Sequence, residues 1–498
     1  MNSNKLALMM LGGFLILSGC VKEEPAEVRT DQTMMNHDEM EDGMSHGEME
    51  GHMSHDEVMQ LKDSTGENEL IVPPVLERNI DGDVTYTVRA QKGETQIFNG
   101  SKTKTYGYNG TFLGPMLQFT KGETIKIRTI NELDQETTFH WHGLEVAADA
   151  DGGPHDALQP GEERVIEFKV TQEAATLWFH PHPHGNTADQ VYNGLAGLIF
   201  IEDENSKHLN VPDDYGKNDF PLIIQDKLFD ENHQLNYREA RNEDGTIGDT
   251  LLINGTVNPK LTVEKEKVRL RIVNGSNARN YTLKLNSGDS FVQIGTDGGF
   301  LNEPVTVQEV TLTPSERAEI VIDFQAIDAT SDLALVNEDG SVLLPFDISH
   351  SNGVASELST QLNDFTLTAE EKNLPVNKTV ELFGMMDHVT INGKKFDPDR
   401  IDFTQEQGVT EVWEIYNKPD IMGGMIHPFH IHGAQFKIIS RDGAAPPENE
   451  QGWKDSIAVH PDETVKIAIQ FKNKGLYMFH CHILEHEDNG MMGQVLVE

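Results

Sequence analysis

The stretch PDETVKIAIQF, residues 461–471, alternates apolar and polar side chains, and this period of two predicts a β-strand with one buried face. Two closely similar stretches occur earlier, PGEERVIEFKV from Pro160 and PSERAEIVIDF from Pro314. The three copies start roughly 150 residues apart, and each follows a strand-like run that ends in asparagine: Asn131, Asn274 and Asn417. The repeat predicts one β unit that occurs three times.

Similar alternation continues through the chain after residue 70, for example in 123–131, 267–275, 318–324 and 464–473. Gly, Pro, Asn and Asp punctuate these runs, and long amphipathic helical patterns are few. The sequence therefore predicts an all-β chain built as β-sandwiches. We expect a first domain at 69–204, a second at 205–350, a linker at 351–375 and a third domain at 376–498.

The composition is strongly acidic. The chain of 498 residues has 39 Lys+Arg against 82 Asp+Glu, a formal net charge of -43. Such a surface repels phosphate backbones, which argues against nucleic acid as a partner, and it attracts small cations.

The N-terminus, MNSNKLALMMLGGFLILSGC, has the pattern of an export signal. Lys5 precedes an apolar run, Leu6 to Leu17, that is too short to span a membrane, and Cys20 stands at the expected cleavage site. Residues 1–20 resemble a bacterial lipoprotein signal, so we expect export and a lipid anchor on Cys20 at the outer face of the cell membrane. An ordinary signal with an incidental cysteine, giving a periplasmic or extracellular protein, is the alternative.

Residues 21–68 form a biased segment that we expect to be disordered, because it has almost no apolar clusters to bury. Between residues 21 and 70 there are 15 acids against 3 Lys/Arg, and seven methionines alternate with four histidines. Thioethers suit Cu(I), and imidazoles suit Cu(I) or Cu(II), so copper capture is favoured over a plain solvated tether.

Four His-x-His pairs are the main chemical signal: His140/His142, His180/His182, His430/His432 and His480/His482. Residues two apart in a strand point to the same face, so each pair aims two imidazoles at one place. Two pairs lie in the first unit, two in the third and none in the second. Eight imidazoles from both ends of the chain predict a metal cluster between the first and third units.

Between His480 and His482 stands Cys481, which must point to the opposite side of its strand. If Cys20 carries lipid, Cys481 has no disulfide partner. His427 and His486 can join it, with Met491, or alternatively Met492, as a weak axial ligand. A His2Cys site with an axial Met describes electron-transfer copper. The backbone from Cys481 to its two histidine neighbours is then a short route from this copper to the cluster.

The motifs HWHG, WFHPH, HPFHIHG and HCHILEHEDNGMM resemble, in order and spacing, the four copper motifs of the multicopper oxidases. The resemblance covers residues 70 to 498 and implies three Greek-key cupredoxin domains, with four copper ions as cofactors. It assigns His427, Cys481, His486 and Met491 to type 1 copper and His140 and His430 to type 2. It assigns the type 3 pair to His142, His180, His182, His432, His480 and His482.

Other polar residues of these motifs have two interpretations. Asp151 and Glu487 stand where the family places proton-relay acids; the alternative is that they are surface carboxylates. Cys481, Asp151 and Glu487 are therefore the predicted catalytic residues. His184 offers a further imidazole, but the family spacing favours His180 and His182.

The resemblance implies an enzyme that oxidises a reducing substrate, with O2 as the acceptor. The alternatives are a copper-storage lipoprotein without turnover and a copper nitrite reductase, which uses fewer histidines and two domains. Substrates within the family include phenols, bilirubin-like pigments, Cu(I), Fe(II) and Mn(II). The methionine-rich insert of the cuprous oxidases is missing between 350 and 380, so the type 1 edge can be open to organic substrates. A role in copper tolerance is the expectation, with a general laccase or bilirubin-oxidase-like enzyme as the alternative.

Overall fold

The structure is a computed structural model that describes residues 59–79, 83–242, 245–327, 332–353, 356–421 and 423–498. The predicted signal peptide and most of the acidic segment, residues 1–58, lie outside the described residues. Among the described residues, no helix has the length and apolar character needed to cross a membrane.

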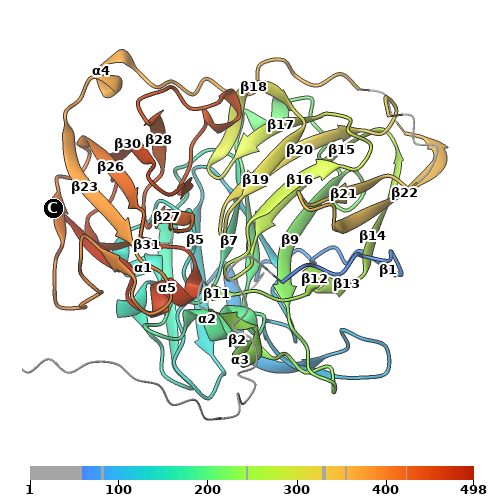
Figure 1. Cartoon of the computed structure of the whole chain (residues 1–498), viewed down its shortest axis with the longest axis horizontal. Helices are drawn as coiled ribbons and strands as arrows, with labels where there is room; N and C mark the ends of the chain where they lie inside the picture. The colour runs from blue at the N-terminus through green and yellow to red at the C-terminus, as the bar shows by residue number, and fades with distance from the viewer. Residues whose placement is uncertain (1–58, 80–82, 243–244, 328–331, 354–355, 422) are drawn as a thin grey trace, which may run out of the picture. The chain divides into compact units, whose positions relative to one another are not determined.

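The first domain is a sandwich of two sheets (Figure 1). One sheet has the order β3 (Thr103–Tyr108), β2 (Tyr86–Thr95), β5 (Thr124–Asn131) and β6 (Glu163–Lys169). The other has the order β4 (Met116–Thr120), β8 (Gly197–Glu202) and β7 (Ala175–Phe179). Two short helices belong to it, α1 (Ala148–Asp151) and α2 (Thr187–Tyr192).

The middle domain has the two largest sheets. The first has the order β1 (Asn68–Glu69), β14 (Pro259–Lys265), β22 (Val342–Asn352), β21 (Ala334–Val336), β16 (Tyr281–Leu285) and β19 (Glu309–Leu312). The second has the order β13 (Thr256–Val257), β12 (Thr250–Ile253), β9 (Asp219–Lys227), β15 (Lys267–Asn274), β20 (Arg317–Asp323), β17 (Phe291–Thr296) and β18 (Gly299–Val307). Helix α3 (Tyr237–Ala240) and the hairpin of β10 (Arg241–Asn242) and β11 (Gly245–Thr246) complete it.

The third domain packs two five-stranded sheets. One has the order β24 (Thr390–Ile391), β23 (Val376–Phe383), β26 (Thr410–Lys418), β30 (Thr464–Gln470) and β28 (Phe436–Arg441). The other has the order β25 (Phe403–Gln405), β32 (Met492–Val497), β31 (Gly475–Cys481), β27 (His427–Ile431) and β29 (Ser456–Val459). Helix α4 (Ala369–Lys372) precedes the domain, and α5 (Leu484–Asp488) follows β31.

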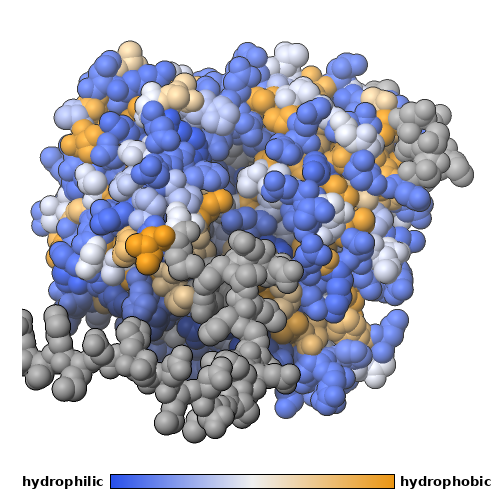
Figure 2. All heavy atoms as spheres, in the orientation of Figure 1, coloured by the Kyte–Doolittle hydropathy of each residue, from blue (hydrophilic) through white to orange (hydrophobic). Residues whose placement is uncertain are grey.

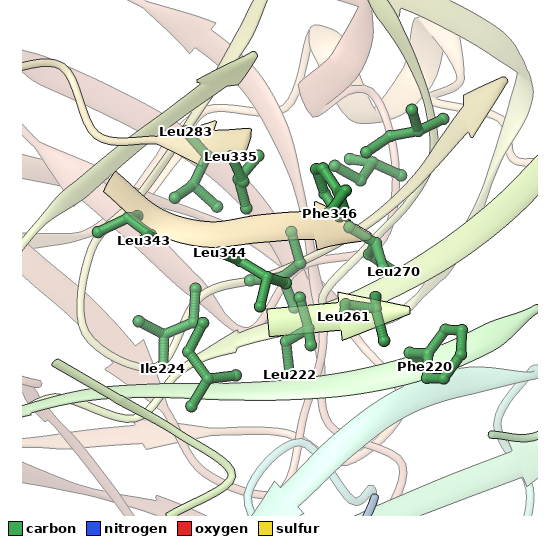
Figure 3. Packing of buried hydrophobic residues seen from close by; sticks show 14 of the residues in the cluster. Phe220, Leu222, Ile224, Leu261, Leu270, Leu283, Leu335, Leu343, Leu344 and Phe346 are labelled. Atoms are coloured by element: carbon green, nitrogen blue, oxygen red, sulfur yellow. The ribbon is translucent and has the colours of Figure 1, made fainter. Parts of the chain in front are cut away.

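The all-β prediction is confirmed, and the four predicted strand runs correspond to β5, β15, β20 and β30. The cores lie between facing sheets because each strand buries alternate side chains. Figure 3 shows this in the middle domain, where Leu261 and Phe346 of one sheet face Leu222 and Leu270 of the other. The face of the molecule in Figure 2 is largely hydrophilic, with scattered hydrophobic residues.

The segment that enters the first domain is packed against the middle domain. Leu61 and Leu70 are buried in the middle-domain core, and β1 pairs with β14. The backbone N–H of Lys62 also donates to the Asp249 carbonyl at 2.8 Å. The prediction that disorder extends to residue 68 is therefore wrong for residues 59–68, because Leu61 and its neighbours find partners there. The predicted boundaries at 204 and 350 stay predictions; β22 ends at Asn352, just past the second one.

The three repeats share one turn. The backbone N–H groups of Asn131, Asn274 and Asn417 donate to the carbonyls of Glu162, Glu316 and Glu463 at 3.0, 3.1 and 3.1 Å. Each asparagine side chain also donates to the carbonyl of the residue two before the repeat proline, which is Leu158, Leu312 or Val459. The residue after that proline has positive φ in all three copies, at Gly161, Ser315 and Asp462. The sequence repeat is therefore a repeat of backbone geometry.

Candidate metal centre

The two strands β27 and β31 separate two groups of metal-ligating side chains by their pleat. They run antiparallel, with His430 opposite His480 and Phe429 opposite Cys481. Side chains alternate between the two faces of a sheet, so the histidines at even positions project to one side, and His427 and Cys481 to the other.

The first domain presents its histidines at strand ends. His140 and His180 form an isolated antiparallel bridge, with N···O distances of 2.9 and 3.1 Å in the two directions. The backbone N–H of His182 donates to Thr138 Oγ1 at 2.7 Å, which fixes the chain just beyond β7. All four imidazoles of this domain are buried, although the flanking segments are loops rather than the strands that the spacing predicted.

The eight imidazoles converge from the first and third domains. His182 and His432 each bring Nε2 close to His480 Nε2, at 3.2 and 3.1 Å. His142 Nδ1 lies 3.3 Å from His180 Nε2. Two nitrogens that are each about 2 Å from one metal in near-tetrahedral geometry lie about 3.3 Å apart. These distances are therefore those of ligands that share a metal ion.

Hydrogen bonds to oxygen fix the orientation of most rings. His180 Nδ1 lies 2.9 Å from the Pro181 carbonyl and His480 Nδ1 lies 3.0 Å from the Cys481 carbonyl. His430 Nδ1 lies 2.8 Å from the Asp455 carbonyl. A ring that donates through Nδ1 presents the lone pair of Nε2, so these contacts select the tautomer that can bind metal.

Burial lowers the pKa of several cluster imidazoles. Loss of hydration lowers the pKa of His480 to about 3 and holds the pKa of His182, His430 and His432 well below the usual range. Repulsion from neighbouring histidines acts in the same direction. Neutral imidazole is the form that ligates metal, so the histidines do not have to lose protons before binding.

Cys481 and two histidines form a second group on the other face. The Cys481 Sγ lies 3.4 Å from His427 Nδ1 and 3.7 Å from His486 Nδ1, and all three side chains are buried. Burial raises the pKa of the Cys481 thiol and lowers that of His427 to about 4. A bound cation would replace the thiol proton, because metal coordination deprotonates a thiol.

Met491 is the better placed of the two axial candidates. Its carbonyl accepts from the Cys481 N–H at 3.1 Å, and its N–H donates to the His486 carbonyl at 2.8 Å. Met492 lies opposite His480 in the β31–β32 register, on the face of the histidine cluster. The strand parity therefore favours Met491 on the cysteine side.

Both predicted acids lie beside cluster histidines and are buried, so neither is a surface carboxylate. Asp151 Oδ2 lies 2.7 Å from His432 Nδ1, and its Oδ1 has no hydrogen-bond partner among the described residues. Glu487 places its two oxygens 3.4 Å from His182 Nε2 and 3.3 Å from His480 Nδ1. Burial and the nearby Asp488 raise the pKa of Glu487 well above its usual range.

The donor set fits copper. Nε2 of His140 and Nε2 of His430 are buried without a hydrogen-bond partner in the described part of the chain, although unpaired buried polar atoms are costly. These are the two histidines that the resemblance to multicopper oxidases assigns to type 2 copper. Imidazole suits copper in either oxidation state and thiolate suits Cu(I), so a shared copper site explains the unpaired atoms and the short nitrogen–nitrogen distances.

Helix α5 fixes the approach of His486 and Glu487 to the two groups. Glu485 accepts hydrogen bonds from Asn277 Nδ2 at 2.9 Å and from the Thr246 N–H at 3.1 Å, both in the middle domain. Asp488 accepts from the Thr187 N–H at 2.8 Å and the Ala188 N–H at 3.0 Å, at the start of α2. In Figure 1, α5 lies beside α2 and β11 accordingly. Residues of the first and middle domains thus hold α5, a helix of the third domain, in position.

No sequence motif predicted Asp455 as part of the site. Its Oδ1 lies 3.0 Å from His142 Nε2, and its carbonyl accepts from His430. No ligand spacing marks this acid; the signal is its place next to Ser456, which pairs with His430 across β27 and β29. His184, the additional imidazole, is exposed, and its ring lies against Phe396 rather than among the other histidines.

Comparisons with known proteins give the class. Sequence profiles described as multicopper oxidase match residues 89–206, 218–345 and 369–498. The chain is 52% identical to multicopper oxidase Mco of Staphylococcus haemolyticus, over 88% of this chain and 94% of that protein. It is similar to the crystal structure of a laccase from Pediococcus acidilactici, with a TM-score of 0.84 and 45% identity, covering 88% and 95% of the two chains. It is also similar to the structure of a Campylobacter jejuni multicopper oxidase described as a metallo-oxidase, with a TM-score of 0.74 and 31% identity. This match covers 90% of the present chain and 99% of the other.

The chain belongs to the multicopper oxidase family. It is a copper-dependent oxidoreductase that uses O2 as its acceptor, and its cofactors are four copper ions of types 1, 2 and 3. The fold is that of three cupredoxin-like domains.

Proposed function

We propose that this enzyme couples one-electron oxidation of Cu(I) or phenolic compounds to the four-electron reduction of O2 to water. The proposed type 1 ligands are His427, Cys481, His486 and Met491. The proposed type 2 ligands are His140 and His430, and the proposed type 3 ligands are His142, His180, His182, His432, His480 and His482.

One observation carries the proposal. Two buried donor groups lie on opposite faces of one strand end, and the backbone of His480, Cys481 and His482 joins them directly. When copper is bound, the thiolate site takes single electrons from the substrate and the three-copper site passes them to O2. A storage protein has no need for two unlike sites joined covalently, so turnover is favoured over storage.

The reduction of O2 to water also consumes protons. Asp151 and Glu487 are the proposed donors, because each contacts cluster histidines in a buried site that bulk water does not freely reach. Burial raises the pKa of Glu487, so its carboxyl group can hold a proton inside the site and donate it there.

The first test is Cys481→Ser. We expect the variant to lose the blue absorption of thiolate-bound copper and all oxidase activity, while the cluster coppers stay bound. The serine hydroxyl is a poor copper ligand, but it leaves His480 and His482 in place. Copper analysis and visible spectra measure this. A wild type that is fully loaded with copper and colourless would contradict the ligand assignment.

Cu(I) is the substrate that the surroundings of Cys481 support best. The backbone of Gly384 hydrogen-bonds to His427, and the half-buried Met385 and Met386 follow it directly. Met425, also half-buried, packs against the core that contains Cys481. Thioethers prefer Cu(I), and the charge of -43 concentrates cations near the protein. The similar metallo-oxidase from Campylobacter jejuni agrees with a metal substrate.

The proposed physiological role is copper tolerance at the cell surface. A lipid on Cys20 would hold the exported enzyme at the outer face of the membrane, where entering Cu(I) can be oxidised to Cu(II). The methionines and histidines of residues 34–59 would collect Cu(I) beside the enzyme. The rival is a general laccase, which the similar Pediococcus acidilactici enzyme and the absent methionine-rich insert support.

A further inference from the structure

His142 differs from most other cluster histidines in the nitrogen that it turns inward. Its Nδ1 lies 3.3 Å from His180 Nε2, whereas His180, His430, His432 and His480 all have Nδ1 against an oxygen atom. The outer nitrogen of His142, Nε2, lies 3.0 Å from Asp455 Oδ1. The carboxylate of Asp455 therefore selects the tautomer that leaves His142 Nδ1 free for metal.

Asp455 is itself held by a residue of the middle domain. Arg317, at the start of β20, donates from Nη1 to Asp455 Oδ1 at 2.7 Å and from Nη2 to Oδ2. Neither side chain has any exposed surface. A planar guanidinium that meets a carboxylate through two parallel bonds fixes both the position and the rotation of that carboxylate.

Arg317 is in turn fixed on its remaining donors. Its Nη2 donates to the Asp297 carbonyl at 2.9 Å, Nη1 to the Ser315 carbonyl at 3.0 Å, and Nε to the Thr176 carbonyl at 3.2 Å. Asp297 pairs with Lys454 at 3.0 Å, so the buried charges alternate in sign. Ser315 Oγ also donates to Ser456 Oγ at 2.8 Å, and Ser456 Oγ lies 3.2 Å from His430 Nδ1.

The Arg317–Asp455 ion pair also explains why residue 143, the last of the HWHG motif, is glycine. A Cβ on Gly143 would lie 2.6 Å from Asp455 Oδ2 and 2.8 Å from Arg317 Nη2, and the residue has φ +90°. The backbone beside His142 can therefore lie against the ion pair only because Gly143 has no side chain.

We propose that Arg317 is a positioning residue of the three-copper site, contributed by the domain that holds no ligand. Its fork holds the Asp455 carboxylate at the angle that keeps His142 Nδ1 and the stacked ring of His430 directed at copper. The rings of His142 and His430 lie 3.7 Å apart at 14°; His142 bonds to the carboxylate of Asp455 and His430 to its backbone carbonyl. The inference rests on the proposed ligand set.

The test compares Arg317→Lys with Arg271→Lys in the whole copper-loaded protein. Arg271, in the same domain, makes a similar fork with Asp219, with bonds of 2.7 Å from Nε and Nη2. Among the described residues, Arg271 makes no bond to a proposed ligand. Lysine keeps the charge in both variants and loses the two-point geometry. Competition with a copper chelator measures affinity, EPR measures coupling of the type 3 pair, and melting temperature measures stability.

We expect Arg317→Lys to weaken cluster copper binding by about 10- to 100-fold, the size typical for residues that orient metal ligands. The share of copper visible by EPR should rise as the type 3 pair loses its coupling, while the blue absorption stays. Arg271→Lys should lower the melting temperature only. Asp455→Asn changes the other partner of the Arg317–Asp455 ion pair. This variant should give the same spectral change if Arg317→Lys does not fold.

Equal copper affinity and EPR spectra in Arg317→Lys and wild type would overturn the inference, whatever the melting temperature does. The same changes in Arg271→Lys would overturn it too, because they would show a general effect of a lost buried fork. A wild type that binds no cluster copper would instead overturn the ligand set itself.

Discussion

At the residue scale, the pleat of one strand separates two groups of candidate copper ligands. Cys481 and its neighbours His480 and His482 are consecutive, yet their side chains belong to different groups because they point to opposite faces. A shift of one residue in the β27–β31 register would place Cys481 among the imidazoles and remove both sites. The buried partners of these strands, Phe429 and Phe479, fix that register.

The acids beside the cluster give a prediction about protons. Asp151→Asn and Glu487→Gln should each slow reoxidation of the reduced enzyme by O2 about 100-fold, because general acid catalysis is typically worth that much or more. Reduction of type 1 copper by substrate should stay nearly unchanged, since both carboxylates face histidines of the cluster rather than the Cys481 thiol. Stopped-flow measurement of the two half-reactions separates the effects.

The control for these two variants is Glu448→Gln, which makes the same change from carboxylate to amide on an exposed side chain. Reoxidation in this control should match the wild type. Reoxidation rates that also match between the acid variants and the control would remove Asp151 and Glu487 from the proton path.

At the element scale, one turn with the same hydrogen bonds recurs in each domain. Asn131, Asn274 and Asn417 join the end of one strand to the loop before the next repeat strand, with the same bonds in each domain. In the first and third domains this turn leads into β6 and β30. In the middle domain it carries Ser315 and Arg317, which reach Ser456 and Asp455 beside the proposed copper ligands.

The turn gives a stability prediction. Asn274 is buried and donates to the Arg279 and Leu312 carbonyls at 2.8 and 2.9 Å, while its Oδ1 accepts from the Ser276 N–H. Asn274→Ala leaves these backbone groups unpaired, so we expect the free energy of unfolding to fall by about 2–4 kcal/mol. Thermal unfolding should show a lower melting temperature, with copper content unchanged.

Asn286→Ala is the matched control, because Asn286 bonds two backbone groups in a similar way but is exposed. Water can replace the lost amide there, so its effect should be much smaller. Equal losses at the two sites would mean that burial of the repeated turn contributes nothing special to stability.

At the scale of the whole molecule, ligands come from the two ends of the chain and support comes from the middle. The first and third domains supply the imidazoles, and the middle domain supplies Arg317 and the partners of Glu485. The segment 59–72 is also attached to the middle domain, because Leu61 and Leu70 are buried in the core of that domain. A truncation meant to remove only the acidic segment must therefore stop before Met59.

Deletion of residues 21–58 tests the proposed role in copper tolerance. If the segment supplies Cu(I), its loss should raise the apparent KM for Cu(I) several-fold, because the effective copper concentration near the type 1 site falls. Oxidation of Fe(II) and of a phenol should not change. Steady-state kinetics with the three substrates side by side measures this, and identical Cu(I) kinetics at low copper would leave the segment as a spacer only.

Much of the fold and of the site is encoded locally. The period of two predicts the strands, the spacing of the repeats predicts three similar domains, and the His-x-His pairs with Cys481 predict two donor groups on opposite faces. The predictions of the strands and of three similar domains are confirmed, because strand geometry depends on neighbouring residues only. The prediction of strands at His140/His142 and His180/His182 is wrong, since the segments that flank these pairs are loops. The same local reasoning failed for residues 59–68, whose composition predicts disorder although the middle domain supplies partners for them.

Tertiary structure decides which nitrogen each histidine turns inward and what holds it there. The His142–Asp455 contact joins residues 313 positions apart, and the Arg317–Asp455 pair joins residues 138 apart across two domains. No period or motif connects such positions, because their proximity follows from how folded domains pack. The amino-acid sequence therefore shows which side chains have the chemistry to bind copper. The packing of the three domains fixes the orientation of those side chains, because a buried hydrogen-bonded neighbour holds each ring in place.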